Sequence, residues 1–246
     1  MGVAVKMAML LAAGLGKRLR PITDSVPKPL VPVAGRTMLD RSLDIVEEAG
    51  IRRAVVNIHY LGDQVVAHCE RRGHPDVMIS DESDKILETG GGVVKALPML
   101  GPEPFALLNA DTFWYEWGRP NLPAMIERFD PKRMDILLML CPLADTTGHP
   151  GGTDFFMDSD GRLRRATDKS HPDGLLYAGA TIYNPTIFHG ASAEPHSLNV
   201  YYDRAIADGR LFGHLMSDAH WFTVGTPDAL PLAERKLAEL GATSRD

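Results

Sequence analysis

Two separate stretches carry the residues whose types suit phosphate chemistry. A segment near the N-terminus holds the cations Arg18 and Lys28, with Gly14 and Gly16 just before Arg18. Asp111 follows a later apolar run. Glycine lets backbone N–H groups approach a polyphosphate, and Lys and Arg neutralise its oxygens. A carboxylate is a preferred Mg²⁺ ligand. The combination predicts nucleotidyl or phosphoryl transfer by positioning and charge neutralisation.

The glycine pair fits neither of two common phosphate motifs. A dinucleotide fingerprint needs a third glycine three residues after Gly16, where this chain has Leu19. A P-loop needs Ser or Thr after its lysine, whereas Lys17 precedes Arg18. The chain instead reads L-A-A-G-x-G-x-R-L-x-P-x-T from residue 11, and P-K-P-L follows. The prolines hold that second segment extended and fix the place of its lysine.

Apolar periodicity predicts strands that alternate with helices. The expected strands span 7–11, 54–58, 77–80, 105–108, 135–141, 175–183, 211–216 and 220–224, and the expected helices span 36–49, 61–69, 93–100, 122–129, 198–206 and 230–240. Asp160-Gly161 predicts a hairpin. Because three glycines in a row weaken a helix, we expect 90–92 to form a turn. Alternation favours a largely parallel sheet, in which ligands gather beyond the carboxyl ends of strands.

Composition narrows the classes of function. The chain has 246 residues and a net charge of −6, which argues against a general nucleic-acid binder. No apolar run approaches the length of a membrane span, so we expect a cytoplasmic protein that binds no membrane. Cys69 and Cys141 are interpreted as reduced core residues. We expect one domain over 1–246, with a nucleotide-binding part at 1–147, a sugar-binding part at 148–226 and a C-terminal helix at 227–246. Oligomeric state does not follow from the sequence.

The ordered N-terminal motif resembles the signature of the sugar-1-phosphate nucleotidyltransferases. L-E-T-G-G-G at 87–92, N-A-D at 109–111 and W-F-T-V-G-T at 221–226 extend the resemblance over nearly the whole chain. It implies an α/β, Rossmann-like nucleotidyltransferase (GT-A-like) fold with a mostly parallel mixed sheet flanked by helices. It also implies an enzyme that uses Mg²⁺, a nucleoside triphosphate and a sugar 1-phosphate. The family member that the chain resembles most transfers UMP from UTP to N-acetylmuramate 1-phosphate in peptidoglycan recycling.

Carried over by position, the resemblance assigns a role to each motif. Arg18, Lys28 and Asp111 are the expected catalytic residues, and Asp111 is also the expected Mg²⁺ ligand. Besides the two cations, the nucleotide is expected to contact Leu11, Ala12, Ala13, Gly14, Gly16, Thr89, Gly90 and Asn109. The sugar is expected to face Asn109, Asp154, Gly179 and Asn199.

Two departures from the family pattern bear on these roles. Thr223 stands where family members commonly have an aspartate that is a second metal ligand. Gly152-Thr153 replaces an Arg-Gly pair that is common before Asp154, which affects the sugar assignment. The sequence also leaves open a guanylyltransferase that acts on mannose or heptose 1-phosphate, because the choice of base rests on backbone contacts and a few side chains. A non-catalytic protein that binds a nucleotide sugar is the alternative of another class.

Overall fold

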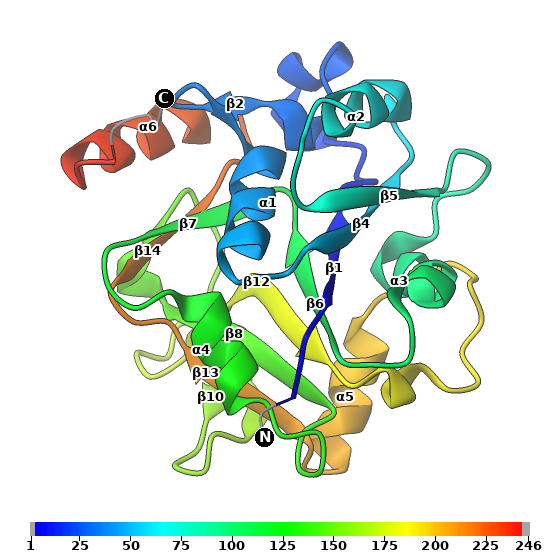
Figure 1. Cartoon of the computed structure of the whole chain (residues 1–246). Helices are drawn as coiled ribbons and strands as arrows, with labels where there is room; N and C mark the ends of the chain where they lie inside the picture. The colour runs from blue at the N-terminus through cyan, green and yellow to red at the C-terminus, as the bar shows by residue number, and fades with distance from the viewer. Residues whose placement is uncertain (1–2, 243–246) are drawn as a thin grey trace.

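A nine-stranded mixed sheet lies at the centre of the protein (Figure 1). The structure is a computed structural model, and it describes residues 3–242. Its main path runs β11 (Leu163–Arg165), β10 (Phe155–Met157), β12 (Leu175–Tyr183), β6 (Phe105–Asn109), β1 (Met7–Leu11), β4 (Arg53–Ile58) and β5 (Asp76–Asp81). β8 (Ile136–Pro142) pairs with β12 and with β13 (Leu211–Leu215). The strands from β6 to β5 are mutually parallel, whereas β12 is antiparallel to β6 and β8. The mixed α/β sheet is as predicted.

Helices cover both faces of this sheet. α1 (Met38–Glu48), α2 (Gly62–Cys69) and α4 (Asn121–Arg128) pack in one apolar cluster, and α3 (Glu88–Leu100) and α5 (Asn199–Ala207) pack in the other. Within β1, Ala8 and Leu10 join the first cluster while Met7 and Met9 join the second. Successive side chains of a strand point to opposite faces, so a strand that is buried on both faces reads as an unbroken apolar run.

A third apolar cluster supports the N-terminal loop. It lies between α6 (Ala229–Glu239) and a small sheet of β7 (Thr112–Glu116), β14 (Ala219–Thr223) and β9 (Thr146–Thr147). Phe113 and Phe222 stack there with ring centroids 5.0 Å apart. Leu19 is fully buried in the same cluster, which ties the glycine-rich loop to the β14 region. The remaining elements are β2 (Pro32–Val33), β3 (Arg36–Thr37) and the 3-10 helices η1 (Lys17–Leu19), η2 (Ile22–Asp24), η3 (Lys28–Leu30), η4 (Leu143–Asp145) and η5 (Pro185–Phe188).

The predicted strands and most predicted helices are confirmed to within about two residues, and β10 and β11 form the expected hairpin. The prediction of a turn at 90–92 was wrong, because α3 begins at Glu88 and contains Gly90, Gly91 and Gly92. A Cβ on Gly90 would lie 2.5 Å from the His196 ring, and one on Gly92 would lie 2.7 Å from Glu82 Oε1. The glycines therefore serve close packing by neighbouring segments, which offsets their low helix propensity.

Both cysteines are unpaired and buried, as predicted. Burial raises the pKa of the Cys69 thiol to about 11 and that of Cys141 to about 12. Between residues 3 and 242, no helix is long and apolar enough to cross a bilayer.

His214 on β13 gives the fold an acid-sensitive position. Burial, followed by the charges of Arg128 and Arg119, lowers the pKa of His214 from 6.5 to about 4. Between these two pKa values the unfolded chain therefore binds more protons than the folded one. The stability that neutral His214 contributes is present above pH 6.5 and is lost as the pH falls toward 4.

We predict that His214→Leu reduces this acid-side loss by about 1–2 kcal/mol near pH 5. Urea denaturation at pH 7 and near pH 5 measures it, with the exposed His189→Asn as the matched control. An unchanged pH dependence in His214→Leu would contradict the assignment.

Candidate active site

The strand register brings three loop-bearing ends to one edge of the sheet. Leu11 at the end of β1 lies beside Asn57 of β4 and Asn109 of β6. A cavity of about 230 Å³ opens at this edge. It is lined by Leu11, Ala13, Gly14, Asn57, Glu82, Ile86, Glu88, Thr89, Asn109 and Asp111. Six of these residues are among those predicted from the sequence, so the structure brings them together.

An ion pair lies at the rim of this cavity. Lys28 Nζ donates a hydrogen bond to Asp111 Oδ2 over 2.6 Å. The side chain of Lys28 is 9% exposed, whereas that of Asp111 is 41% exposed. Lys28 begins η3, and Pro27 before it is held at φ −64° and ψ 141°. The proline-flanked backbone therefore delivers a buried cation to the carboxylate that follows β6.

The glycine-rich loop folds back onto this lysine. Gly16 has φ +62°, and a Cβ there would lie 3.0 Å from Thr23 Cγ2 and 3.2 Å from Lys28 Cβ. Thr23 is fully buried, and its hydroxyl donates to the carbonyl of Gly16 over 2.8 Å. Arg18 is exposed on η1, and its guanidinium lies 3.8 Å from where a Cβ of Gly225 would be. The loop thus directs Arg18 toward the segment that follows β14.

Thr223 ends β14 opposite Thr112, the residue directly after Asp111. Thr223 therefore lies across the β7–β14 ladder from the neighbour of Asp111, and its side chain is a neutral hydroxyl. No cluster of three or more His, Cys, Asp or Glu side chains with metal-binding geometry occurs in the described part of the chain. One carboxylate and a neutral hydroxyl suit a magnesium ion that takes most of its ligands from phosphate and water.

A buried polar network underlies the cavity, and the sequence analysis did not identify it. Asn57 Oδ1 accepts from the Ala12 N–H over 2.7 Å, and Asn57 Nδ2 donates to Glu82 Oε1 over 2.7 Å. The Leu87 N–H donates to the other oxygen of Glu82 over 3.3 Å. Glu82 is 1% exposed, so burial raises the pKa of its carboxyl, against the opposing effect of the Asn57 hydrogen bond. The feature of the sequence that could have indicated this network is Asn57, a polar amide within the otherwise apolar strand 54–58.

Two of the predicted sugar residues, Gly179 and Asp154, lie on or beside β12, the strand next to β6. Gly179 has φ +80° at a bulge in β12, and a Cβ there would lie 2.5 Å from Thr112 Oγ1. Asp154 Oδ2 accepts from the Tyr177 N–H over 3.0 Å, and its other oxygen lies 3.5 Å from Lys169 Nζ. These contacts anchor the start of β12 beyond the end of β6.

Two predicted residues are already engaged by the chain itself. Asn199 is exposed at the start of α5, where its Oδ1 accepts from Arg165 over 2.9 Å. The Gly90 N–H donates to the carbonyl of His196 over 2.7 Å. That N–H therefore already has a partner within the protein, and Thr89 is the residue beside it that lines the cavity.

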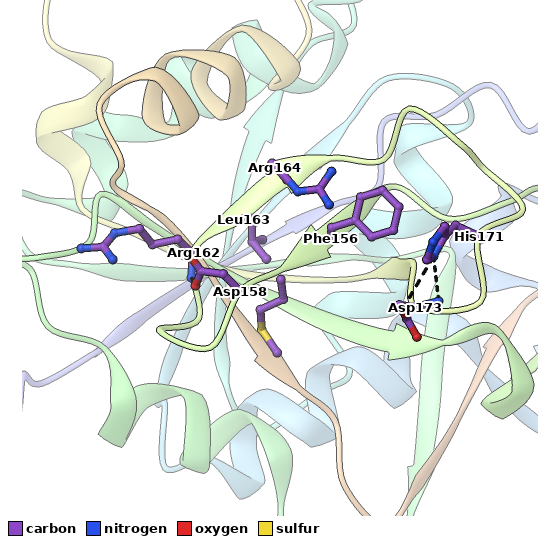
Figure 2. A pocket seen from close by; sticks show the side chains of 8 residues that line it. Phe156, Asp158, Arg162, Leu163, Arg164, His171 and Asp173 are labelled. Carbon is purple, nitrogen blue, oxygen red and sulfur yellow. Dashed lines mark hydrogen bonds and ion pairs between the residues drawn. The ribbon is translucent and has the colours of Figure 1, made fainter.

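A second cavity of about 320 Å³ lies at the β10–β11 hairpin (Figure 2). Its lining includes Arg164, whose guanidinium carbon lies 4.2 Å from the centre of the Phe156 ring. His171 lies edge-on to the same Phe156 ring, with ring centroids 5.0 Å apart, and its Nδ1 lies 4.0 Å from Asp173 Oδ2. Its lining contains none of the predicted site residues.

Comparison with known proteins identifies the family of this site. A family model for nucleotidyl transferases matches residues 7–239. The chain belongs to the nucleotidyl transferase family. It is 41% identical to an N-acetylmuramate α-1-phosphate uridylyltransferase of Caulobacter vibrioides, over 97% of this chain and 100% of that protein. It is 34% identical to a protein of the same name from Neisseria meningitidis serogroup B, over 76% of this chain and 78% of that protein.

Solved structures confirm the fold. The inositol-1-phosphate CTP transferase of T. maritima superposes with a TM-score of 0.77 at 18% identity, covering 99% of this chain and 97% of that one. HddC from Yersinia pseudotuberculosis, solved with GMP-PN, gives 0.77 at 21% identity, covering 95% and 100%. As a member of this family, the chain is a nucleotidyltransferase with the expected mixed sheet.

The Asn57–Glu82 network generates a test of stability. We predict that Asn57→Leu lowers the free energy of unfolding by about 1–3 kcal/mol, because it removes the hydrogen bond to Glu82 Oε1 and leaves the Ala12 N–H without a partner. Chemical denaturation measures the loss. In a double-mutant cycle, Asn57→Leu with Glu82→Leu should cost less than the two single changes together. Strict additivity would show that the two side chains do not interact.

Proposed function

We propose that this enzyme transfers UMP from UTP to N-acetylmuramate 1-phosphate and releases pyrophosphate and UDP-N-acetylmuramate. The observation that carries the proposal is the Lys28–Asp111 pair at the mouth of the cavity formed by the strand ends. A cation and a carboxylate at one rim suit two anionic substrates and a magnesium ion. The uridylyltransferases of Caulobacter and Neisseria supply the substrate identity.

The reaction needs no covalent intermediate on the protein. An oxygen of the sugar phosphate attacks the α-phosphorus of the nucleotide, and the bond from that phosphorus to the β-phosphate oxygen breaks to release pyrophosphate. Lys28 Nζ carries three N–H donors and gives one to Asp111, so two remain for phosphate oxygens. Arg18 is proposed to neutralise the β- and γ-phosphates that leave. Their contribution is positioning and charge stabilisation.

Magnesium is the proposed cofactor. Asp111 would hold it together with substrate phosphates, and Thr223 would offer at most a neutral oxygen from the neighbouring strand. When bound, the ion supplies positive charge that neutralises the phosphates and orients them. This donor set fits a metal that is completed by the nucleotide, because the described residues provide no closed cage.

The cavity lining suggests how the nucleotide is recognised. We propose that the base and ribose lie along residues 11–14, Thr89 and Gly90. Glu82 belongs to this lining, but it is 1% exposed and its two oxygens already accept hydrogen bonds from Asn57 and Leu87. The base is therefore proposed to be read mainly by backbone groups, which glycine lets it approach closely.

The sugar is proposed to lie against Asn109, Gly179 and Asp154, with Asn199 at its edge. The substrates are cytoplasmic metabolites, so we propose a cytoplasmic enzyme of peptidoglycan recycling. A guanylyltransferase that acts on mannose or heptose 1-phosphate remains the second candidate, because one of the relatives of this chain is a guanylyltransferase. A D-glycero-α-D-manno-heptose 1-phosphate guanylyltransferase of Aneurinibacillus thermoaerophilus is 27% identical over 94% of this chain and 97% of that protein.

Pyrophosphate release measured across four nucleoside triphosphates and a panel of sugar 1-phosphates tests the proposal. We predict selective release with UTP and N-acetylmuramate 1-phosphate in the presence of Mg²⁺. Asp111→Asn should reduce turnover at least a hundredfold, because the amide cannot supply the anionic ligand. Circular dichroism should show a folded variant with a lower melting temperature, because Lys28 loses its counter-charge. GTP preference would promote the guanylyltransferase, and nucleotide-sugar binding without any turnover would support the non-catalytic alternative.

Thr223 generates a second test. We predict that Thr223→Asp lowers the Mg²⁺ concentration needed for half-maximal binding several-fold, because a carboxylate joins Asp111. Titration of Mn²⁺ by electron paramagnetic resonance, with bound nucleotide, measures this without turnover. Thr223→Asn is the matched neutral control and should leave the affinity near wild type. Weaker metal binding in Thr223→Asp than in Thr223→Asn would refute the placement of Thr223 at the metal.

A further inference from the structure

The 194–198 segment, which precedes α5, lies along the 87–91 segment at the start of α3. The His196 N–H donates to the Leu87 carbonyl over 3.3 Å. In return, the His196 carbonyl accepts from the N–H groups of Gly90 and Gly91 over 2.7 and 3.3 Å. These bonds satisfy donors that a helix start leaves unpaired. The two segments are therefore joined by backbone hydrogen bonds that do not depend on the side chain of His196.

The close fit requires glycine on the α3 side. A Cβ on Gly90 would lie 2.8 Å from the His196 carbonyl oxygen, and one on Gly91 would collide with the carbonyl oxygen of Glu194. Backbone atoms cannot move aside as a flexible side chain can. The contact is thus a fixed feature of the fold. By contrast, the Lys85–Glu194 ion pair beside it is exposed at both ends and contributes little.

One side-chain hydrogen bond links this contact to the cavity. Thr89 lines the nucleotide cavity, and its hydroxyl oxygen accepts from the Leu198 N–H over 3.0 Å. Asn199, expected to face the sugar, is the next residue and begins α5. Thr89, in the wall of the nucleotide cavity, is therefore connected to Asn199 through a single hydrogen bond to Leu198, the residue before Asn199.

α5 in turn packs on the strand that carries Gly179. Tyr202 of α5 is buried, accepts a hydrogen bond from the Tyr183 hydroxyl over 3.1 Å and lies edge-on to Tyr177, with ring centroids 6.1 Å apart. Tyr177 and Tyr183 flank Gly179 on β12. These rings connect α5 directly to the proposed sugar-binding strand.

We propose that Thr89 is a positioning residue that couples nucleotide binding to sugar-phosphate binding through Leu198 and the start of α5. This inference rests on the proposed function. A nucleotide that contacts Thr89 further restrains the acceptor of the Leu198 N–H, so the second substrate meets an α5 start that is held more firmly. Such a coupling is reciprocal: each substrate tightens the binding of the other by the same factor.

Calorimetry with a nucleotide that cannot react tests the coupling. The affinity for α,β-imido-UTP with Mg²⁺ is measured with and without saturating N-acetylmuramate 1-phosphate, and the ratio of the two values is the coupling factor. We expect about fivefold or more in the wild type. Thr89→Val keeps the shape but removes the acceptor, and should reduce the factor to less than about twofold. Thr89→Ser should restore it, and Glu194→Gln should leave it at the wild-type value.

The outcomes separate this inference from the proposed function. If the wild type binds neither ligand, the proposed function fails. If it binds both but shows a factor of one, or if Thr89→Val keeps the wild-type factor, the coupling role is overturned while the function stands. Equal impairment in Thr89→Ser and Thr89→Val would also overturn it, because the serine hydroxyl retains the acceptor. Thermal melting of each variant verifies that the fold is intact.

Discussion

The ion pair between Lys28 and Asp111 is the interaction on which the arrangement of the site depends. It joins two loops that are 83 residues apart in the chain. Lys28 is almost fully buried, and a buried ammonium without a counter-charge is strongly disfavoured. The pair therefore holds the proline-flanked segment against the end of β6 before any substrate arrives. Because Asp111 keeps much of its surface exposed, the same contact leaves a carboxylate facing the cavity.

Two layers of support keep this pair in place. Gly16, with its positive φ, lets the N-terminal loop pack directly on Lys28, and Leu19 anchors that loop in the cluster shared with β14. From beneath, Asn57 fixes the Ala12 N–H and shares a hydrogen bond with Glu82. A satisfied polar network in a low-dielectric interior is rigid and specifies one geometry. The binding surface is thus preorganised largely by residues that are not themselves expected to touch the reacting atoms.

Much of the architecture followed from the sequence, because apolar periodicity marks elements that are buried on one or both faces. The edge at which Leu11, Asn109 and Asp111 meet followed from the rule that loops at the carboxyl ends of parallel strands converge. The start of α3 did not, because local propensity places three glycines in a turn, and only the close approach of residues 194–198 and Glu82 explains them in a helix.

Hydrogen bonds between residues far apart in the chain were the second feature that the sequence did not predict. Asn57 and Glu82 are 25 residues apart, and nothing in their local sequence pairs them. Likewise, the short strand β7 is specified by its pairing with β14 far along the chain, which local periodicity does not encode. The contact that orders the start of α5 belongs to the same class, since the Thr89 hydroxyl and the Leu198 N–H are 109 residues apart.

The reactivity of the two buried cysteines can be used to detect local or global unfolding of the protein. Cys69 is the last residue of α2, and Cys141 lies on β8, between β12 and β13 in the sheet. Thiol reagents attack the thiolate, and both thiols here are shielded and held protonated. Alkylation of the native enzyme must therefore await local or global unfolding. The labelling rates of the two thiols separate fraying of one helical layer from rupture of the central sheet, without any introduced probe.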